Sequence, residues 1–166
     1  MVTSEKIVSM SAIIIAIASI FITFWQGIEM RNHNRLSVRP NLEMVFSVDS
    51  KSYGYQLENK GLGPAIIRDK AYYIDGKEAV EHGFSGLDSI LSILKFTDRQ
   101  LIHSSLGKGR SIRAEEKLNI FKFYFLEEDD KETLIKKIYT RLAIIIEYES
   151  MYGEKFTCRI PSEFEP

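Results

Sequence analysis

The stretch from Ile7 to Ile28, IVSMSAIIIAIASIFITFWQGI, contains 22 residues and no charged side chain. Because an α-helix rises about 1.5 Å per residue, this run matches the thickness of a hydrocarbon core, about 30 Å. A cleaved signal peptide is the alternative, but its apolar part is usually only about 7–15 residues long, and no small-x-small cleavage site follows the run. The sequence therefore predicts one retained helix that spans a lipid bilayer.

Positive charges near the two ends of this run indicate its orientation. Lys6 and the terminal amine precede the run, whereas Arg31, Arg35 and Arg39 follow it within about 15 residues. The more basic side is expected in the cytoplasm. The single cysteine, Cys158, agrees with a reducing compartment because it leaves no intramolecular disulfide to form. We expect a single-pass protein of the bacterial inner membrane whose soluble part is cytoplasmic.

The less apolar residues of the run follow a 3-4-3-4-3 spacing, which places them on one stripe of a helix. This small-residue stripe consists of Ser9, Ala12, Ala16, Ser19, Thr23 and Gln26. Small side chains allow two helices to approach closely, and a period of 3.5 residues favours left-handed packing. A chance distribution is the alternative, since Ser11, Ala18 and Gly27 lie off the line. The stripe predicts a homo-oligomer formed through the helix and extended by a helical linker at residues 29–36.

The chain divides by composition into an anchor with its linker, residues 1–38, and a soluble domain, residues 39–166. The 128 residues of the second part are enough for one domain with its own hydrophobic core. The first 38 residues hold three of the 22 Lys and Arg and two of the 23 Asp and Glu, which leaves 19 positive and 21 negative charges in the domain. A net charge of −2 argues against general nucleic-acid binding, which depends on neutralising phosphates.

Short alternating segments dominate the domain and predict an antiparallel β-structure. Arg39-Pro40 ends the linker helix, because the residue before a proline is disfavoured in a helix. The expected strands are Leu42–Val48, Tyr53–Leu57, Ala65–Ile74, Glu78–Val80, Leu101–Ser105, Ser111–Arg113, Lys117–Phe125, Leu142–Met151 and Lys155–Ile160. Turn residues recur about every ten positions, as in sandwiches and small barrels. The expected fold is mainly β, with an immunoglobulin-like antiparallel sandwich preferred to a small barrel.

Two short helices are expected to interrupt the strands. Gly86–Lys95 carries apolar residues on one face, and Ser85 and Asp88 before and within it are spaced as a capping box. Lys131–Thr140 follows the acidic run Glu127–Asp130, which suits the positive end of a helix. We interpret both helices as caps on open ends of the sandwich. A membrane-surface role for Gly86–Lys95 is the alternative.

Three segments resemble features of small uncharacterised bacterial membrane proteins in which one N-terminal span precedes a β-sandwich. These segments are Arg39-Pro40, the stretch YQLENKGLGPA at Tyr55–Ala65, and the stretch EYESMYGEKFT at Glu147–Thr157. The layout is also similar, more loosely, to bacterial antiviral effectors in which a β-barrel senses a cyclic nucleotide and the membrane part then assembles. Those effectors commonly have more than one span. The resemblance implies the fold and assigns no chemistry.

The stretch Gly107–Ser111, GKGRS, is the strongest candidate for a ligand-binding site. It lacks the G-x-x-x-x-G-K-[ST] spacing of a phosphate loop, so a hairpin turn is the expected structure. The residues that can form an anion-binding edge there are Lys108, Arg110 and Arg113. Arg68 or Lys70 joins them if the sheets bring these residues near. Solvated turn charges are the alternative.

Other motifs predict no metal, cofactor or catalytic site. The three histidines are far apart in sequence and are accompanied by no second cysteine, and no Gly-x-Ser-x-Gly elbow surrounds the serines beside His103. The acidic run Glu127–Asp130 lacks the alternating oxygens and the glycine of an EF-hand loop. An aromatic stretch, Phe121, Phe123, Tyr124 and Phe125, is expected to be mostly core, with any exposed member able to dock a protein.

The sequence thus favours a membrane-anchored, non-enzymatic binding or assembly protein. Its β domain is expected to recognise a protein or a small ligand of unknown identity, while its helices self-associate. Two alternatives stay open. One is a membrane-disrupting effector that is gated by ligand sensing in the β domain, and the other is an envelope scaffold with a periplasmic domain.

Overall fold

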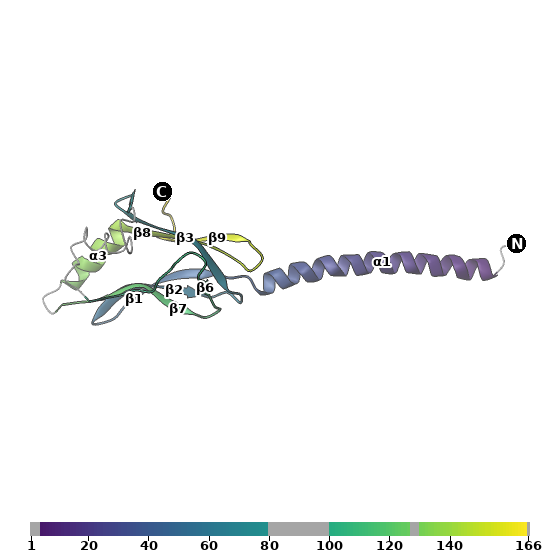
Figure 1. Ribbon diagram of the computed structural model, residues 1–166, viewed down its shortest axis with the longest axis horizontal. Helices are drawn as coiled ribbons and strands as arrows, with labels where there is room; N and C mark the ends of the chain where they lie inside the picture. The colour runs from purple at the N-terminus through teal and green to yellow at the C-terminus, as the bar shows by residue number, and fades with distance from the viewer. Residues whose placement is uncertain (1–3, 80–99, 127–129, 166) are drawn as a thin grey trace. The chain divides into compact units, whose positions relative to one another are not determined.

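A computed structural model describes residues 4–79, 100–126 and 130–165 of the chain. The chain forms two compact units, Met1–Ser37 and Val38–Pro166 (Figure 1). Each unit is described by itself.

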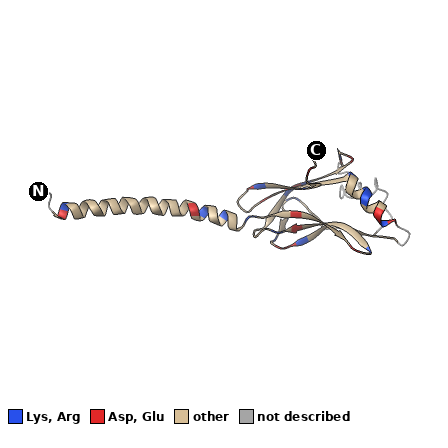
Figure 2. Ribbon diagram, turned by 180° about the vertical axis from the view of Figure 1, so that it is seen from behind, with Lys and Arg blue, Asp and Glu red and all other residues tan. Residues whose placement is uncertain are grey.

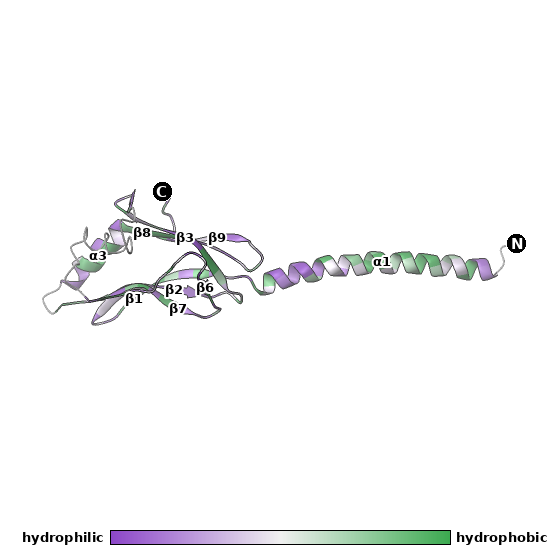
Figure 3. Ribbon diagram, in the orientation of Figure 1, coloured by the Kyte–Doolittle hydropathy of each residue, from purple (hydrophilic) through white to green (hydrophobic). Residues whose placement is uncertain are grey.

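The first unit is one continuous helix, α1, at Ser4–Ser37. Its 34 residues correspond to a length of about 51 Å. Figure 3 shows an apolar middle between hydrophilic ends, and Figure 2 shows charged residues only at the two ends. By length and composition this helix is able to cross a membrane, and none of its described residues is buried. The predicted linker at residues 29–36 belongs to the same helix.

The second unit is a sandwich of two antiparallel sheets, which confirms the expected fold class (Figure 1). The first sheet has the order β1-β2-β7-β5, with β1 at Leu42–Val48, β2 at Ser52–Asn59, β7 at Lys117–Tyr124 and β5 at Leu101–Ile102. The second has the order β4-β3-β8-β9, with β4 at Lys77–Glu78, β3 at Ala65–Ile74, β8 at Leu142–Glu149 and β9 at Lys155–Ile160. Strand β6, Ser111–Ile112, pairs with β3. One further helix, α3, is described at Lys131–Arg141.

The predicted bounds of three strands are confirmed. β1, β3 and β9 begin and end at the predicted residues. Strand β5 stops at Ile102, although Ser104 N–H still donates to the carbonyl of Asn119 at 2.8 Å. Asp130 caps α3 by accepting from the Thr133 hydroxyl at 2.6 Å and from Thr133 N–H at 3.3 Å, and these two bonds lower the pKa of Asp130. The predicted helix at residues 86–95 lies outside the described residues.

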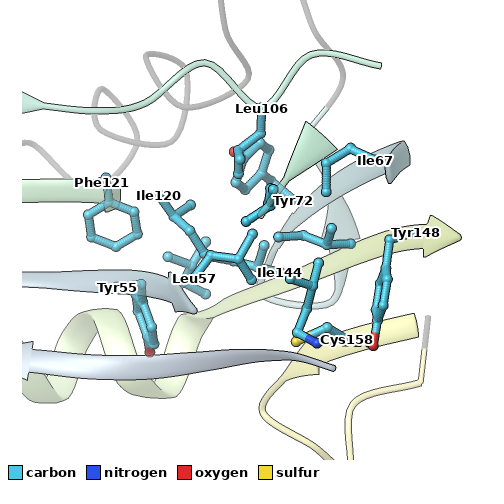
Figure 4. Packing of buried hydrophobic residues seen from close by; sticks show 14 of the residues in the cluster. Tyr55, Leu57, Ile67, Tyr72, Leu106, Ile120, Phe121, Ile144, Tyr148 and Cys158 are labelled. Atoms are coloured by element: carbon cyan, nitrogen blue, oxygen red, sulfur yellow. Dashed lines mark hydrogen bonds between the residues drawn. The ribbon is translucent and has the colours of Figure 1, made fainter. Parts of the chain in front are cut away.

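The core lies between the two sheets and is built from alternate strand residues (Figure 4). In β2, Tyr53, Tyr55 and Leu57 are almost completely buried, and Ile144 and Ile146 of β8 are buried in the opposing sheet. This alternation is the pattern expected of strands with one face on a core. Burial raises the pKa of the single thiol, Cys158, to about 11.

Helix α3 passes into β8 without a loop, and an ion pair fixes this corner. The hairpin turn between β3 and β4 has positive φ angles at Asp75 (52°) and Gly76 (77°), as a type I′ turn requires. Arg141, the last residue of α3, donates from Nε and Nη2 to the two carboxylate oxygens of Asp75 at 2.8 and 2.6 Å. This bidentate pairing lowers the pKa of Asp75.

The start of the β domain is held by one buried carboxamide, that of Asn59 at the end of β2. Its Oδ1 accepts from the backbone N–H groups of Asn41 at 3.1 Å and Gly61 at 3.0 Å. Its Nδ2 donates to the carbonyls of Gly63 at 2.8 Å and Ile112 at 3.1 Å. Asn59 is fully buried, the two bonds that its Nδ2 donates are buried, and the two that its Oδ1 accepts are partly buried. They join the incoming chain, the loop after β2, and β6.

Two glycines in the loop after β2 allow this close approach. A Cβ on Gly61 would lie 2.4 Å from the backbone nitrogen of Asn41, and one on Gly63 would lie 1.7 Å from the carbonyl oxygen of Val38. Leu62 N–H, between them, donates to the carbonyl of Arg39 at 3.2 Å. The loop therefore lies directly against the backbone of the incoming chain.

We predict that Asn59→Ala lowers the free energy of unfolding of the β domain by about 3 kcal/mol, because it leaves buried donors and acceptors without partners. Urea unfolding followed by near-UV circular dichroism measures the change. Asn41→Ala is the matched control, since the Asn41 side-chain amide donates to the half-exposed carboxylate of Glu43 at 3.3 Å and the variant keeps the backbone N–H that donates to Asn59. Equal losses in the two variants would contradict the role of the buried carboxamide.

Candidate functional site

A β-bulge in β3 places two consecutive charged residues on the surface of the second sheet. The pairing of β3 with β8 shifts between Ile67, which lies opposite Tyr148, and Asp69, which lies opposite Glu147. Arg68 is the extra residue, and both Arg68 and Asp69 are exposed. A regular strand would have sent these neighbours to opposite faces.

The basic turn at Gly107–Arg110 lies beside this bulge. Gly109 N–H donates to the carbonyl of Ile67 at 2.8 Å, and Ile67 N–H donates to the carbonyl of Arg110 at 2.9 Å. Gly109 has a φ of 83°, a conformation that favours glycine. These backbone bonds fix the exposed Lys108 next to the bulge.

The bulge, the turn and the last hairpin surround a cavity of about 360 Å³. This charged cavity is lined by Arg68, Asp69, Lys108, Glu147, Tyr148, Lys155, Phe156 and Thr157. In the register of the sheet, Asp69, Glu147 and Thr157 form one row across β3, β8 and β9. Three cationic and two anionic side chains thus converge from three strands and one turn.

One of the cations already has a partner. Arg68 Nη1 lies 3.5 Å from Oε1 of Glu149, and the Arg68 side chain is about half exposed. An ion pair with this exposure contributes little to stability, so it orients the guanidinium more than it stabilises the fold.

The structure brings together only some of the residues proposed from sequence. Lys108 and Arg68 line the same cavity. Arg110 donates to the carbonyl of Ser105 and lies 3.9 Å from Glu116, outside the cavity lining. Arg113, the third predicted member, is likewise not part of the lining.

Two further residues complete the comparison with the sequence prediction. The ammonium of Lys70 lies 5.7 Å from the ring centre of Tyr72 and not in the cavity lining. Lys155 lines the cavity but was not proposed from sequence, because its position depends on the register of β9 against β8.

Tyr148 and Phe156 separate the charged cavity from a smaller hollow of about 310 Å³ at the start of the domain. Their rings stack with centres 5.4 Å apart, and the guanidinium of Arg39 lies 4.8 Å from the ring centre of Phe156. The hydroxyl of Tyr148 accepts from Leu42 N–H at 3.2 Å. Burial raises the pKa of Tyr148, so the hydroxyl stays neutral. Tyr148 and Phe156 therefore line the charged cavity and also contact the first residues of the β domain.

A second surface is an apolar groove of about 500 Å³ between α3 and the first sheet. Its apolar lining consists of Phe46, Val48, Phe125, Ile135 and Tyr139. Of the aromatic stretch considered for protein docking, Phe121 and Phe123 are buried in the core, and Phe125 lines the groove.

The small-residue stripe lies on α1, and every member of it is exposed: Ser9, Ala12, Ala16, Ser19, Thr23 and Gln26. The hydroxyls of Ser9, Ser19 and Thr23 donate to the carbonyls four residues earlier at 2.8–2.9 Å. Such bonds satisfy the hydroxyl hydrogens within the helix.

Among the residues that the structure describes, no group of three or more His, Cys, Asp or Glu side chains is placed to hold a metal ion.

Comparisons with known proteins identify no family. No family model matches the chain. No curated protein matches it either. Among solved structures, the periplasmic stator protein FlaG of the archaellum from Sulfolobus acidocaldarius aligns over 73% of this chain and 97% of its own, with 10% identity and a TM-score of 0.30. A likeness at this level carries no argument about this chain.

Proposed function

We propose that this chain is a single-pass membrane protein whose α1 anchors and assembles a non-enzymatic β domain, and that this domain recognises an anionic ligand at the charged cavity. The exposed apolar surface of α1 carries the proposal. Its large hydrophobic side chains between Ile7 and Ile28 are about half to three quarters exposed, and none is buried. Exposing so large a contiguous apolar surface to water is unfavourable, and the hydrocarbon core of a bilayer removes it from water.

The orientation follows from charge. Arg31 and Arg35 lie on the last turns of α1, and Arg39 follows the helix by two residues, whereas Lys6 and the terminal amine precede the apolar run. The positive-inside rule then favours a cytoplasmic β domain.

Self-association is supported by the small-residue stripe and by Gln26 at its end. Within the described residues, the side-chain amide of Gln26 has no hydrogen-bond partner, whereas the three stripe hydroxyls are satisfied within the helix. A partner helix supplies the missing bond for Gln26 and packs closely against the small side chains.

Ser19→Leu with Thr23→Leu tests this part of the proposal. We expect self-association in liposomes, measured by energy transfer between labelled copies, to weaken about tenfold because the larger side chains keep the helices apart. Ser11→Leu with Ala18→Leu enlarges small residues off the stripe and is expected to change little. Equal weakening in both variants would show that the stripe has no special role.

The charged cavity is tested with inorganic phosphate as the probe. We expect the full chain in phosphatidylcholine nanodiscs to bind phosphate, and Lys108→Gln with Lys155→Gln to weaken binding about tenfold. Lys77→Gln, which removes an exposed cation in β4, is the control.

Added salt is expected to weaken phosphate binding further, because exposed charges are screened. Phosphate binding that the double variant leaves unchanged would place the anion elsewhere and contradict the proposed site.

A further inference from the structure

Four charged side chains around the charged cavity lack an ionic partner. Within the described residues, neither Lys108 nor Lys155 forms an ion pair or a hydrogen bond through its ammonium. Glu147 likewise has no ion pair, and the carboxylate of Asp69 accepts only from the backbone N–H of Lys70 at 2.8 Å. Two positive and two negative groups therefore face one hollow without neutralising each other.

Strand pairing and backbone hydrogen bonds fix the positions from which these four side chains extend. Asp69 and Glu147 lie opposite each other on neighbouring strands, an arrangement of like charges that costs free energy. Lys155 lies opposite Glu149, two residues along β8 from Glu147. Lys108 is held by the turn that is bonded to Ile67. The carboxylates are thus neighbours in the sheet, and Lys108 and Lys155 belong to the lining of the same cavity.

An isolated anion can pair with the two lysines of the cavity but not with its two carboxylates. A phosphate attracted by Lys108 and Lys155 also lies near two carboxylates that repel it. A ligand with a primary ammonium offers these carboxylates three N–H donors and a positive charge. A quaternary ammonium offers the charge without the donors.

We propose that the charged cavity binds a small zwitterion, with its phosphate or carboxylate toward Lys108 and Lys155 and its primary ammonium between Asp69 and Glu147. The inference rests on the proposed function, because it names the ligand chemistry of the same cavity. The cavity volume, about 360 Å³, lies within the range of small-molecule sites, about 300–1,000 Å³.

Calorimetric titration of the full chain in phosphatidylcholine nanodiscs compares three probes: inorganic phosphate, O-phosphoethanolamine and phosphocholine. We expect O-phosphoethanolamine to bind at least about tenfold more tightly than phosphate or phosphocholine, because only its ammonium donates to both carboxylates. Salt and pH are held constant across the three titrations.

Glu147→Gln is the decisive variant, because it removes one carboxylate from an exposed position and leaves the lysines in place. We expect the preference for O-phosphoethanolamine over phosphate to fall below about threefold, while phosphate itself binds as well or better. Glu78→Gln, an exposed change in β4, is the matched control and is expected to keep the full preference.

The outcomes separate this inference from the proposed function. Phosphate binding that depends on Lys108 and Lys155, with no preference for O-phosphoethanolamine, overturns the zwitterion and leaves an anion site. A preference that survives Glu147→Gln overturns the assigned place of the ammonium. If none of the probes binds, the charged cavity is not a site for anions or zwitterions, and the ligand recognition assigned to it in the proposed function fails as well.

The same zwitterion chemistry occurs in free metabolites and in lipid headgroups. Repeating the O-phosphoethanolamine titration in nanodiscs that contain phosphatidylethanolamine distinguishes these sources. Weaker apparent binding shows that the lipid headgroup competes for the cavity, whereas unchanged binding assigns the cavity to a soluble ligand.

Discussion

The fold depends on one constraint, the buried carboxamide of Asn59, which fixes where the chain enters the β domain. A buried amide with unmatched donors or acceptors is costly, so its four bonds define one arrangement of the incoming chain, the loop after β2 and β6. Gly61 and Gly63 extend the constraint, because any side chain at either position would collide with backbone. The first residues of the domain are thereby held against the end of β2 and the loop that follows it.

A short series of hydrogen bonds connects Asn59 to the lining of the charged cavity. Asn59 donates to the carbonyl of Ile112 in β6, and the residues just before β6 form the turn that bonds to Ile67. That turn carries Lys108, while the bulge after Ile67 supplies Arg68. Packing at the start of the domain thus positions two of the cations that line the cavity.

The long strands and the sandwich were predictable from sequence, whereas the composition of the cavity was not. Alternation in Leu42–Val48 indicates a half-buried strand directly. A bulge leaves no such signal, so the exposure of both Arg68 and Asp69 was not foreseen. Lys155 joins the cavity through the register of β9, which sequence alone does not specify, while Arg110 turns to Ser105 and Glu116.

The central claim is that α1 anchors the β domain in a membrane, with that domain in the cytoplasm. The most direct measurement is protease accessibility of a tag placed after Pro166, in intact spheroplasts and in lysed cells, with the protein first shown to stay in the membrane fraction at alkaline pH. The account predicts a membrane-bound protein whose tag is protected until lysis. Release from the membrane, or cleavage of the tag in intact spheroplasts, would contradict it.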